Sequence, residues 1–127
     1  MPNKETCTWP SYLFLRIGTG RIESRVEKNS DKEMTTVKAY NQSLLDGKDH
    51  TLYLQWKNVG ESATDPNAAI YIYGWVDQTP AVGYENADFI FSAVAGDSID
   101  QGVLTHELFA ELWNETGAGW FSMDTYG

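Results

Sequence analysis

The chain has 127 residues, of which 42% are hydrophobic and 13% aromatic, so it is long enough and apolar enough to fold as one domain, residues 1–127, with its own core. Its net charge of −9 and pI near 4.5 disfavour direct binding to nucleic acids or anionic membranes, because proteins bind these polyanions through Lys and Arg. All nine Lys and Arg residues lie at or before Lys57, whereas eleven of the eighteen carboxylates follow it. Basic proteins, metal cations and neutral ligands remain as partners.

The N-terminal sequence contains a single cysteine and no targeting pattern. Because Cys7 is the single cysteine, the chain forms no intrachain disulfide. The sequence leaves open whether Cys7 is buried, a free thiol or bridged to another chain. No basic start precedes an apolar run, so we expect no signal peptide in the chain, and the uncharged stretches are too polar to span a bilayer. We expect a soluble protein, either cytoplasmic or secreted after removal of a signal peptide.

The first predicted elements are two strands joined by a tight turn. Leu13, Leu15 and Ile17 share one face, and alternation resumes over residues 21–27. Gly18-Thr19-Gly20 lies between them and supplies glycines that adopt positive φ. This pattern predicts a hairpin with one solvated face.

The segment 31–45 fits two secondary structures. Ser30-Asp31-Lys32-Glu33 matches a capping box, and the apolar residues that follow have roughly helical spacing. The run Thr35-Thr36-Val37 is β-branched and favours a strand. We interpret 34–40 as a strand and keep a helix as the alternative.

The central strands are predicted by alternation between turn-forming clusters. They cover residues 51–57, 69–77 and 88–95, and a polar loop from 58 to 67 separates the first two. On 69–77, one face carries Ile70, Ile72 and Val76. The other face carries Tyr71, Tyr73, Trp75 and Asp77.

The segment 103–113 also fits two periods. Leu104, Leu108 and Leu112 are four residues apart, as in a helix, yet the same stretch alternates in steps of two. We interpret it as a strand that forms a terminal hairpin with residues 120–126. The predicted fold is therefore all-β, an antiparallel β-sandwich or small β-barrel of about seven or eight strands, with or without one short helix.

Metal-binding patterns are weak, and we predict no cofactor and no metal ligands. His106-Glu107 begins like a zinc motif, but Ala110 occupies the position of the second histidine. Calcium is the one cation that the acidic loops suit, and three clusters could supply oxygen ligands. These clusters are Asp97-Ser98-Asp100, Asp65 with Asn67, and Asp77 with Glu85, Asn86 and Asp88.

Catalytic patterns are also weak, so an enzyme is the least favoured class. The chain has two histidines and no nucleophile motif, which leaves no triad to propose. Glu107 and Glu111 share a face in either interpretation of 103–113. A small β-barrel enzyme with these carboxylates as acid and base is a second alternative.

The aromatic residues give the leading hypothesis. A ring plane beside a carboxylate or an amide suits a neutral polyol, because the ring covers C–H groups while the oxygens bind hydroxyls. We predict a non-catalytic, lectin-like module that binds a neutral ligand, with carbohydrate first, through Tyr73, Trp75, Asp77 and Tyr84. The first alternative is an acidic interaction or inhibitor protein that docks a basic protein or a second copy of itself, in the manner of a nucleic-acid mimic.

Overall fold

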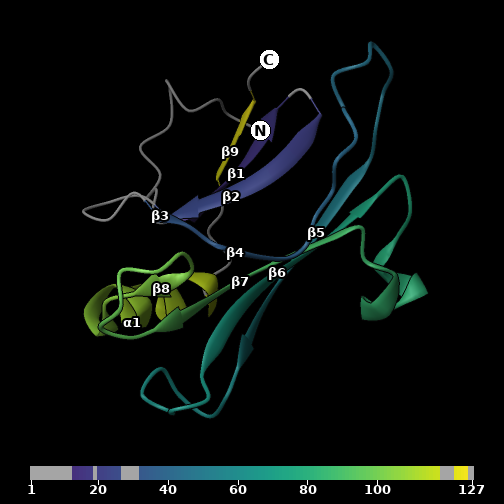
Figure 1. Cartoon of the computed structure of the whole chain (residues 1–127). Helices are drawn as coiled ribbons and strands as arrows, with labels where there is room; N and C mark the ends of the chain where they lie inside the picture. Colours follow the sequence, from purple (N-terminus) through teal and green to yellow (C-terminus); the bar gives the residue numbers. More distant parts are fainter. Residues whose placement is uncertain (1–12, 19, 27–31, 118–121, 126–127) are drawn as a thin grey trace.

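The computed structural model describes residues 13–18, 20–26, 32–117 and 122–125. Within these ranges the protein is all-β, with strands in two sheets and one α-helix, α1 (His106–Gly117) (Figure 1). The first sheet has the order β3-β2-β1-β9, formed by β1 (Leu13–Gly18), β2 (Arg21–Val26), β3 (Lys32–Glu33) and β9 (Ser122–Thr125). The second sheet has the order β4-β7-β6-β5, with β8 on β7, formed by β4 (Thr35–Lys38), β5 (Leu52–Val59), β6 (Ala69–Val76), β7 (Phe89–Ala95) and β8 (Val103–Leu104).

The predicted N-terminal hairpin is confirmed. β1 and β2 pair antiparallel from Leu13↔Val26 to Gly18↔Arg21. Gly20 has a φ of 88°, the left-handed conformation that the turn requires and that glycine adopts without steric cost.

The segment from Lys32 to Tyr40 joins the two sheets. β3 pairs with β2, and β4 pairs with β7. The Met34 N–H donates to the Ser24 carbonyl at 3.0 Å, and the Ile22 N–H donates to the Tyr40 carbonyl at 3.2 Å. The predicted strand at 34–40 is thus confirmed, and the alternative helix does not form. Because one segment contributes to both sheets, the described strands form a sandwich joined along this segment.

The predicted strand at 103–113 is wrong beyond Leu104, because helix α1 begins at His106. The Thr105 hydroxyl accepts a hydrogen bond from the Leu108 N–H at 3.2 Å, which caps the helix N-terminus. Leu108, Phe109 and Leu112 are all buried. A strand would have placed Phe109 on the face opposite the two leucines, so burial of all three favours the helical period.

The predicted terminal hairpin is also wrong. β9 lies within the predicted strand at 120–126, but it pairs parallel with β1, in the register Phe14↔Ser122 to Ile17↔Thr125. Helix α1 occupies the position that the hairpin partner would have taken in the sequence. β8 also pairs parallel, with the end of β7, so the sandwich is antiparallel except at these two strand pairs.

The core lies between the sheets and is closed at one end by α1. Both sheets and the helix contribute to one hydrophobic cluster, whose members include Leu15, Ile22, Val26, Ile70, Ile72, Phe89, Phe91, Leu108 and Leu112. Burying a side chain of this size stabilises the folded state by roughly 1.5–3 kcal/mol. The inner face of β6 is therefore fully used by the core, which leaves its outer face for other contacts.

Candidate ligand-binding face

The candidate site lies on the outer face of β5 and β6, away from the first sheet. The antiparallel register of these strands sets three cross-strand pairs on this face: Tyr53 with Trp75, Gln55 with Tyr73, and Lys57 with Tyr71. Tyr84 joins them from the 3-10 helix η2 (Tyr84–Asn86). We call the accessible side chains of this group the tyrosine face, which consists of Tyr53, Gln55, Lys57, Tyr71, Tyr73 and Tyr84.

Trp75, a predicted ligand contact, has no exposed surface. Its indole Nε1–H donates to the Gly83 carbonyl at 3.1 Å. Its ring lies 6.3 Å from the Tyr73 ring and 6.1 Å from the Tyr84 ring, centroid to centroid. The loop that contains η1 (Pro80–Val82) and η2 therefore folds back over the indole. Trp75 packs beside the rings of the tyrosine face, and its burial does not support the predicted direct contact.

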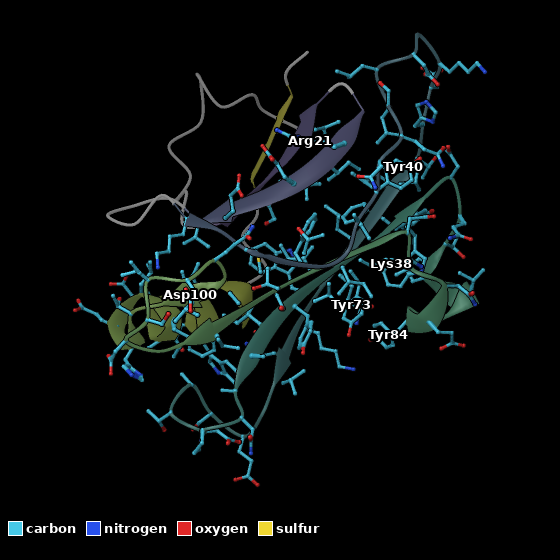
Figure 2. The ribbon with its side chains drawn as sticks, viewed as in Figure 1. Arg21, Lys38, Tyr40, Tyr73, Tyr84 and Asp100 are labelled. Carbon is cyan, nitrogen blue, oxygen red and sulfur yellow. The ribbon has the colours of Figure 1, made fainter. Side chains whose placement is uncertain are left out.

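Tyr73 and Tyr84, the two other predicted aromatic residues, do come together (Figure 2). Their ring centroids are 4.7 Å apart and their planes are tilted by 54°. Tyr71 stacks beside Tyr73 on the same strand, with centroids 6.0 Å apart. The three rings form a continuous aromatic surface beside β5, because residues two apart on a strand share a face.

Polar groups from β5 complete the tyrosine face. The Gln55 Nε2–H donates to the Tyr84 hydroxyl at 2.6 Å. The Lys57 ammonium lies 4.4 Å from the centroid of the Tyr84 ring, in cation–π geometry. Sequence reasoning missed both residues. The alternation over 51–57 places them on one face, but only the register with β6 shows that this face meets the tyrosines.

The surroundings of Tyr73 favour the neutral form of its phenol. Burial raises the pKa of Tyr73, and the neighbouring Tyr71 and Tyr84 hydroxyls raise it further. A neutral phenol both donates and accepts hydrogen bonds. The face therefore offers hydroxyl groups, the Gln55 amide and the Lys57 ammonium.

Asp77, the remaining predicted contact, anchors a loop at the end of β6. Its Oδ2 lies 2.8 Å from His50 Nδ1, and its Oδ1 accepts from the Thr51 N–H at 3.0 Å. Its φ of 58° is the positive value that Asp adopts more readily than most residues. The structure thus assigns Asp77 to this loop rather than to the tyrosine face.

His50 is held between two carboxylates, an arrangement that the sequence did not reveal. Its Nε2 lies 2.8 Å from Asp46 Oδ1, opposite the contact with Asp77. Hydrogen bonds that His50 donates to Asp77 and then to Asp46 raise the pKa of His50. The hydrogen bond with His50 in turn lowers the pKa of each carboxyl group. Only the imidazolium donates from both ring nitrogens, so the full arrangement requires protonated His50.

In the acidic loops, side-chain oxygens accept hydrogen bonds from backbone N–H groups of the same turns. The Asp65 carboxylate accepts from the backbone N–H groups of Asn67 and Glu61, and these hydrogen bonds lower the pKa of Asp65. The Ser98 hydroxyl accepts from the Asp100 N–H at 3.0 Å. Across the residues that the structure describes, no three His, Cys, Asp or Glu side chains gather in a group that could hold a metal ion.

Glu107 and Glu111 lie one turn apart on α1. Glu107 is exposed and Glu111 is half-buried. Acid catalysis by a carboxyl group at neutral pH requires shielding from water, and Glu107 does not have it. Helix α1 therefore presents this pair near solvent rather than in a closed cavity.

No protein-family model, curated protein or solved structure matches this chain. Among the described residues, no helix is both long and apolar enough to cross a membrane.

Proposed function

We propose that this protein is a non-catalytic binding module that takes a neutral ligand, with carbohydrate as the leading class, on the tyrosine face. The observation that carries the proposal is the contact of the Gln55 amide with the Tyr84 hydroxyl among accessible tyrosine rings. Rings and amides side by side match a sugar, which has apolar C–H surfaces between its hydroxyl groups.

The rings provide the apolar part of this site. Tyr53 and Tyr84 are 41% and 38% exposed, so each offers surface to a ligand. Both residues neighbour the buried Trp75, which is the cross-strand partner of Tyr53 and whose ring lies 6.1 Å from that of Tyr84. A rigid support lowers the entropy that an aromatic side chain loses on binding.

The polar groups provide hydrogen bonds in both directions. The bond between Gln55 and Tyr84 uses one amide hydrogen and one hydroxyl lone pair. The Gln55 carbonyl and the Tyr84 hydroxyl hydrogen have further capacity, and the Lys57 ammonium donates to sugar oxygens. This set suits hydroxyl groups and requires no negative charge on the ligand.

The test is a glycan array probed with the full chain, followed by calorimetry on the glycans that bind. We expect Tyr84→Ala to weaken binding about tenfold, because it removes a ring and a hydroxyl from the site. Gln55→Ala should weaken binding less. Affinity for a neutral glycan should change little when salt is raised from about 0.05 to 0.5 M, since screening acts on charges.

The matched control is Val82→Ala. Val82 lies in η1 on the same loop, is 41% exposed and is not part of the tyrosine face. It should leave affinity within about twofold of the wild-type value. An array without binding, or glycan binding that Tyr84→Ala and Gln55→Ala both leave unchanged, would refute the proposal.

A further inference from the structure

A second surface, separate from the tyrosine face, surrounds Ile99 in the turn between β7 and β8. Ile99 is 91% exposed, whereas the other exposed large hydrophobic side chains of the described residues lie between 38% and 55%. A single exposed apolar residue is common on protein surfaces. Exposure of Ile99 indicates a binding site only together with the surface beside it. In Figure 2, Asp100 from this turn and Tyr84 lie toward opposite ends of the molecule.

An open groove of about 410 Å³ lies beside Ile99. Its apolar wall consists of Ile99, Val103 and Leu104. Lys32 also lines the groove, and its ammonium donates to the carbonyls of Val103 at 3.0 Å and Asp100 at 3.4 Å. The groove thus combines a protruding side chain with adjoining apolar surface, and the cation of Lys32 is held by backbone oxygens.

Two exposed carboxylates lie at this groove: Asp97 lines it, and Asp100 adjoins it, because its carbonyl accepts from the lining residue Lys32. Asp97, Asp100 and Glu107 are all exposed, and the Asp97 side chain is 98% exposed. The His106 Nε2 lies 3.7 Å from the Asp97 carboxylate. Asp97 and Asp100 outnumber Lys32, the one lysine among the lining residues, so the surroundings of the groove attract cations.

We infer that the Ile99 groove docks a basic segment of a partner protein, in which Lys or Arg residues flank an apolar side chain. The apolar side chain packs against Ile99 and Val103, and the flanking cations pair with Asp97 and Asp100. Charge complementarity selects this occupant over an acidic peptide or a nucleic acid.

A second copy of this chain fits the groove less well. Of the four described lysines, Lys48 is exposed in the loop at residues 46–51, and the other three are engaged within the molecule: Lys32 at the groove, Lys38 with the Ala87 carbonyl, and Lys57 over the Tyr84 ring. Displacing these contacts would oppose self-association. Because the chain carries a net charge of −9, like-charge repulsion also opposes a second copy, and charge favours a different, basic protein.

The test is selection of a random-peptide display library on the immobilised full chain. We expect enriched peptides in which Lys or Arg flank an apolar residue. In fluorescence anisotropy with one such peptide, Ile99→Ser should weaken binding about tenfold, because it removes the central apolar contact. The paired change Asp97→Asn and Asp100→Asn should weaken binding at low salt and flatten its salt dependence.

Two controls separate docking from general attraction. Val37→Ser changes another exposed apolar residue, and Glu61→Gln removes a carboxylate from the 58–67 loop. Both should bind the peptide as the wild type does, and unfolding curves should show that Ile99→Ser folds normally. Enrichment of no basic peptide, or equal binding by Ile99→Ser and Val37→Ser, would overturn the inference. Because Tyr84→Ala leaves this groove intact, failure here is distinguishable from failure of glycan binding.

Discussion

The two faces of β6 differ in what covers them. On the inner face, Ile70 and Ile72 are completely buried between the sheets. On the outer face, Tyr71 and Tyr73 remain partly accessible, while Trp75 is completely buried although it lies outside the hydrophobic core cluster. Strand alternation therefore determines the face on which a side chain lies, but a local loop determines whether that side chain reaches solvent.

Aromatic residues on the inner and outer sides of this sheet have different roles. Phe89 and Phe91 pack in the core with their ring centroids 5.5 Å apart. The tyrosines on the other side pack with comparable spacing but carry hydroxyl groups, which retain hydrogen bonds at a surface. Inner rings should govern stability, and outer rings should govern binding.

The largest expected effect tests this division directly. Phe89→Ala should lower the free energy of unfolding by about 3–5 kcal/mol, because it leaves a cavity in a packed core. Tyr71→Ala should lower it by less than about 1 kcal/mol, since the ring is partly solvated and contributes through cross-strand packing. Urea unfolding of both variants measures the contrast. Equal losses would mean that the outer face is buried in an assembly.

A smaller effect is expected from Gly74→Ala, a change on the inner face of β6. A methyl group at Gly74 would overlap the ring of Phe89, its neighbour on β7. Overpacking of this kind costs about 1–3 kcal/mol in unfolding free energy. The companion change Phe89→Leu makes room, so the double variant should lose less stability than the sum of the single losses. Additive losses in urea unfolding would contradict the proposed contact.

The sequence predicted the strands better than the site. Alternation identified β2, β5, β6 and β7 because each has one face in the core. It failed at α1, where Leu104, Leu108 and Leu112 satisfy both periods. The Thr105 cap and the burial of Phe109 decide that case, and both are apparent only in three dimensions.

For the site, the sequence identified Tyr73 and Tyr84 but not their surroundings. Trp75 follows the same alternation as Tyr73, so its coverage by the Gly83 loop could not be foreseen. Gln55 is separated from Tyr84 by 29 positions. Such a contact depends on strand register and loop path, which no local pattern encodes.

Trp75→Phe should lower the free energy of unfolding moderately, and it tests whether the buried indole also contributes to binding. It keeps an aromatic ring but removes the hydrogen bond to the Gly83 carbonyl. Loss of one such bond costs roughly 1 kcal/mol in unfolding free energy. If the indole supports the tyrosine face, glycan affinity should also fall, although the ligand does not touch position 75. Unchanged affinity in calorimetry with reduced stability would restrict Trp75 to a structural role.

The smallest expected effect concerns the end of β6, where hydrogen bonds between charged side chains hold a loop. Here His50 ties the loop at residues 46–51 to Asp77. Hydrogen bonds to Asp77 and Asp46 raise the pKa of His50 in the folded protein, so folding favours the imidazolium. This contribution to stability is fully present below the unfolded pKa of about 6.5 and is lost as pH rises through the higher folded value. The same contacts lower the pKa of both carboxyl groups, so their contribution is lost in acid, as pH falls through the folded values.

The chain's second histidine allows a clean measurement of this effect. In a His106→Gln background, His50 is the one remaining imidazole. An NMR titration should give it a pKa above the ordinary histidine value of about 6.5. Between pH of about 5 and 8, thermal unfolding of this protein should show a loss of stability that the additional change His50→Gln reduces. If His50 titrates at or below its ordinary value, the carboxylates do not hold the imidazolium, and the loop must be held at β6 by the Thr51 backbone contacts with Asp77 instead.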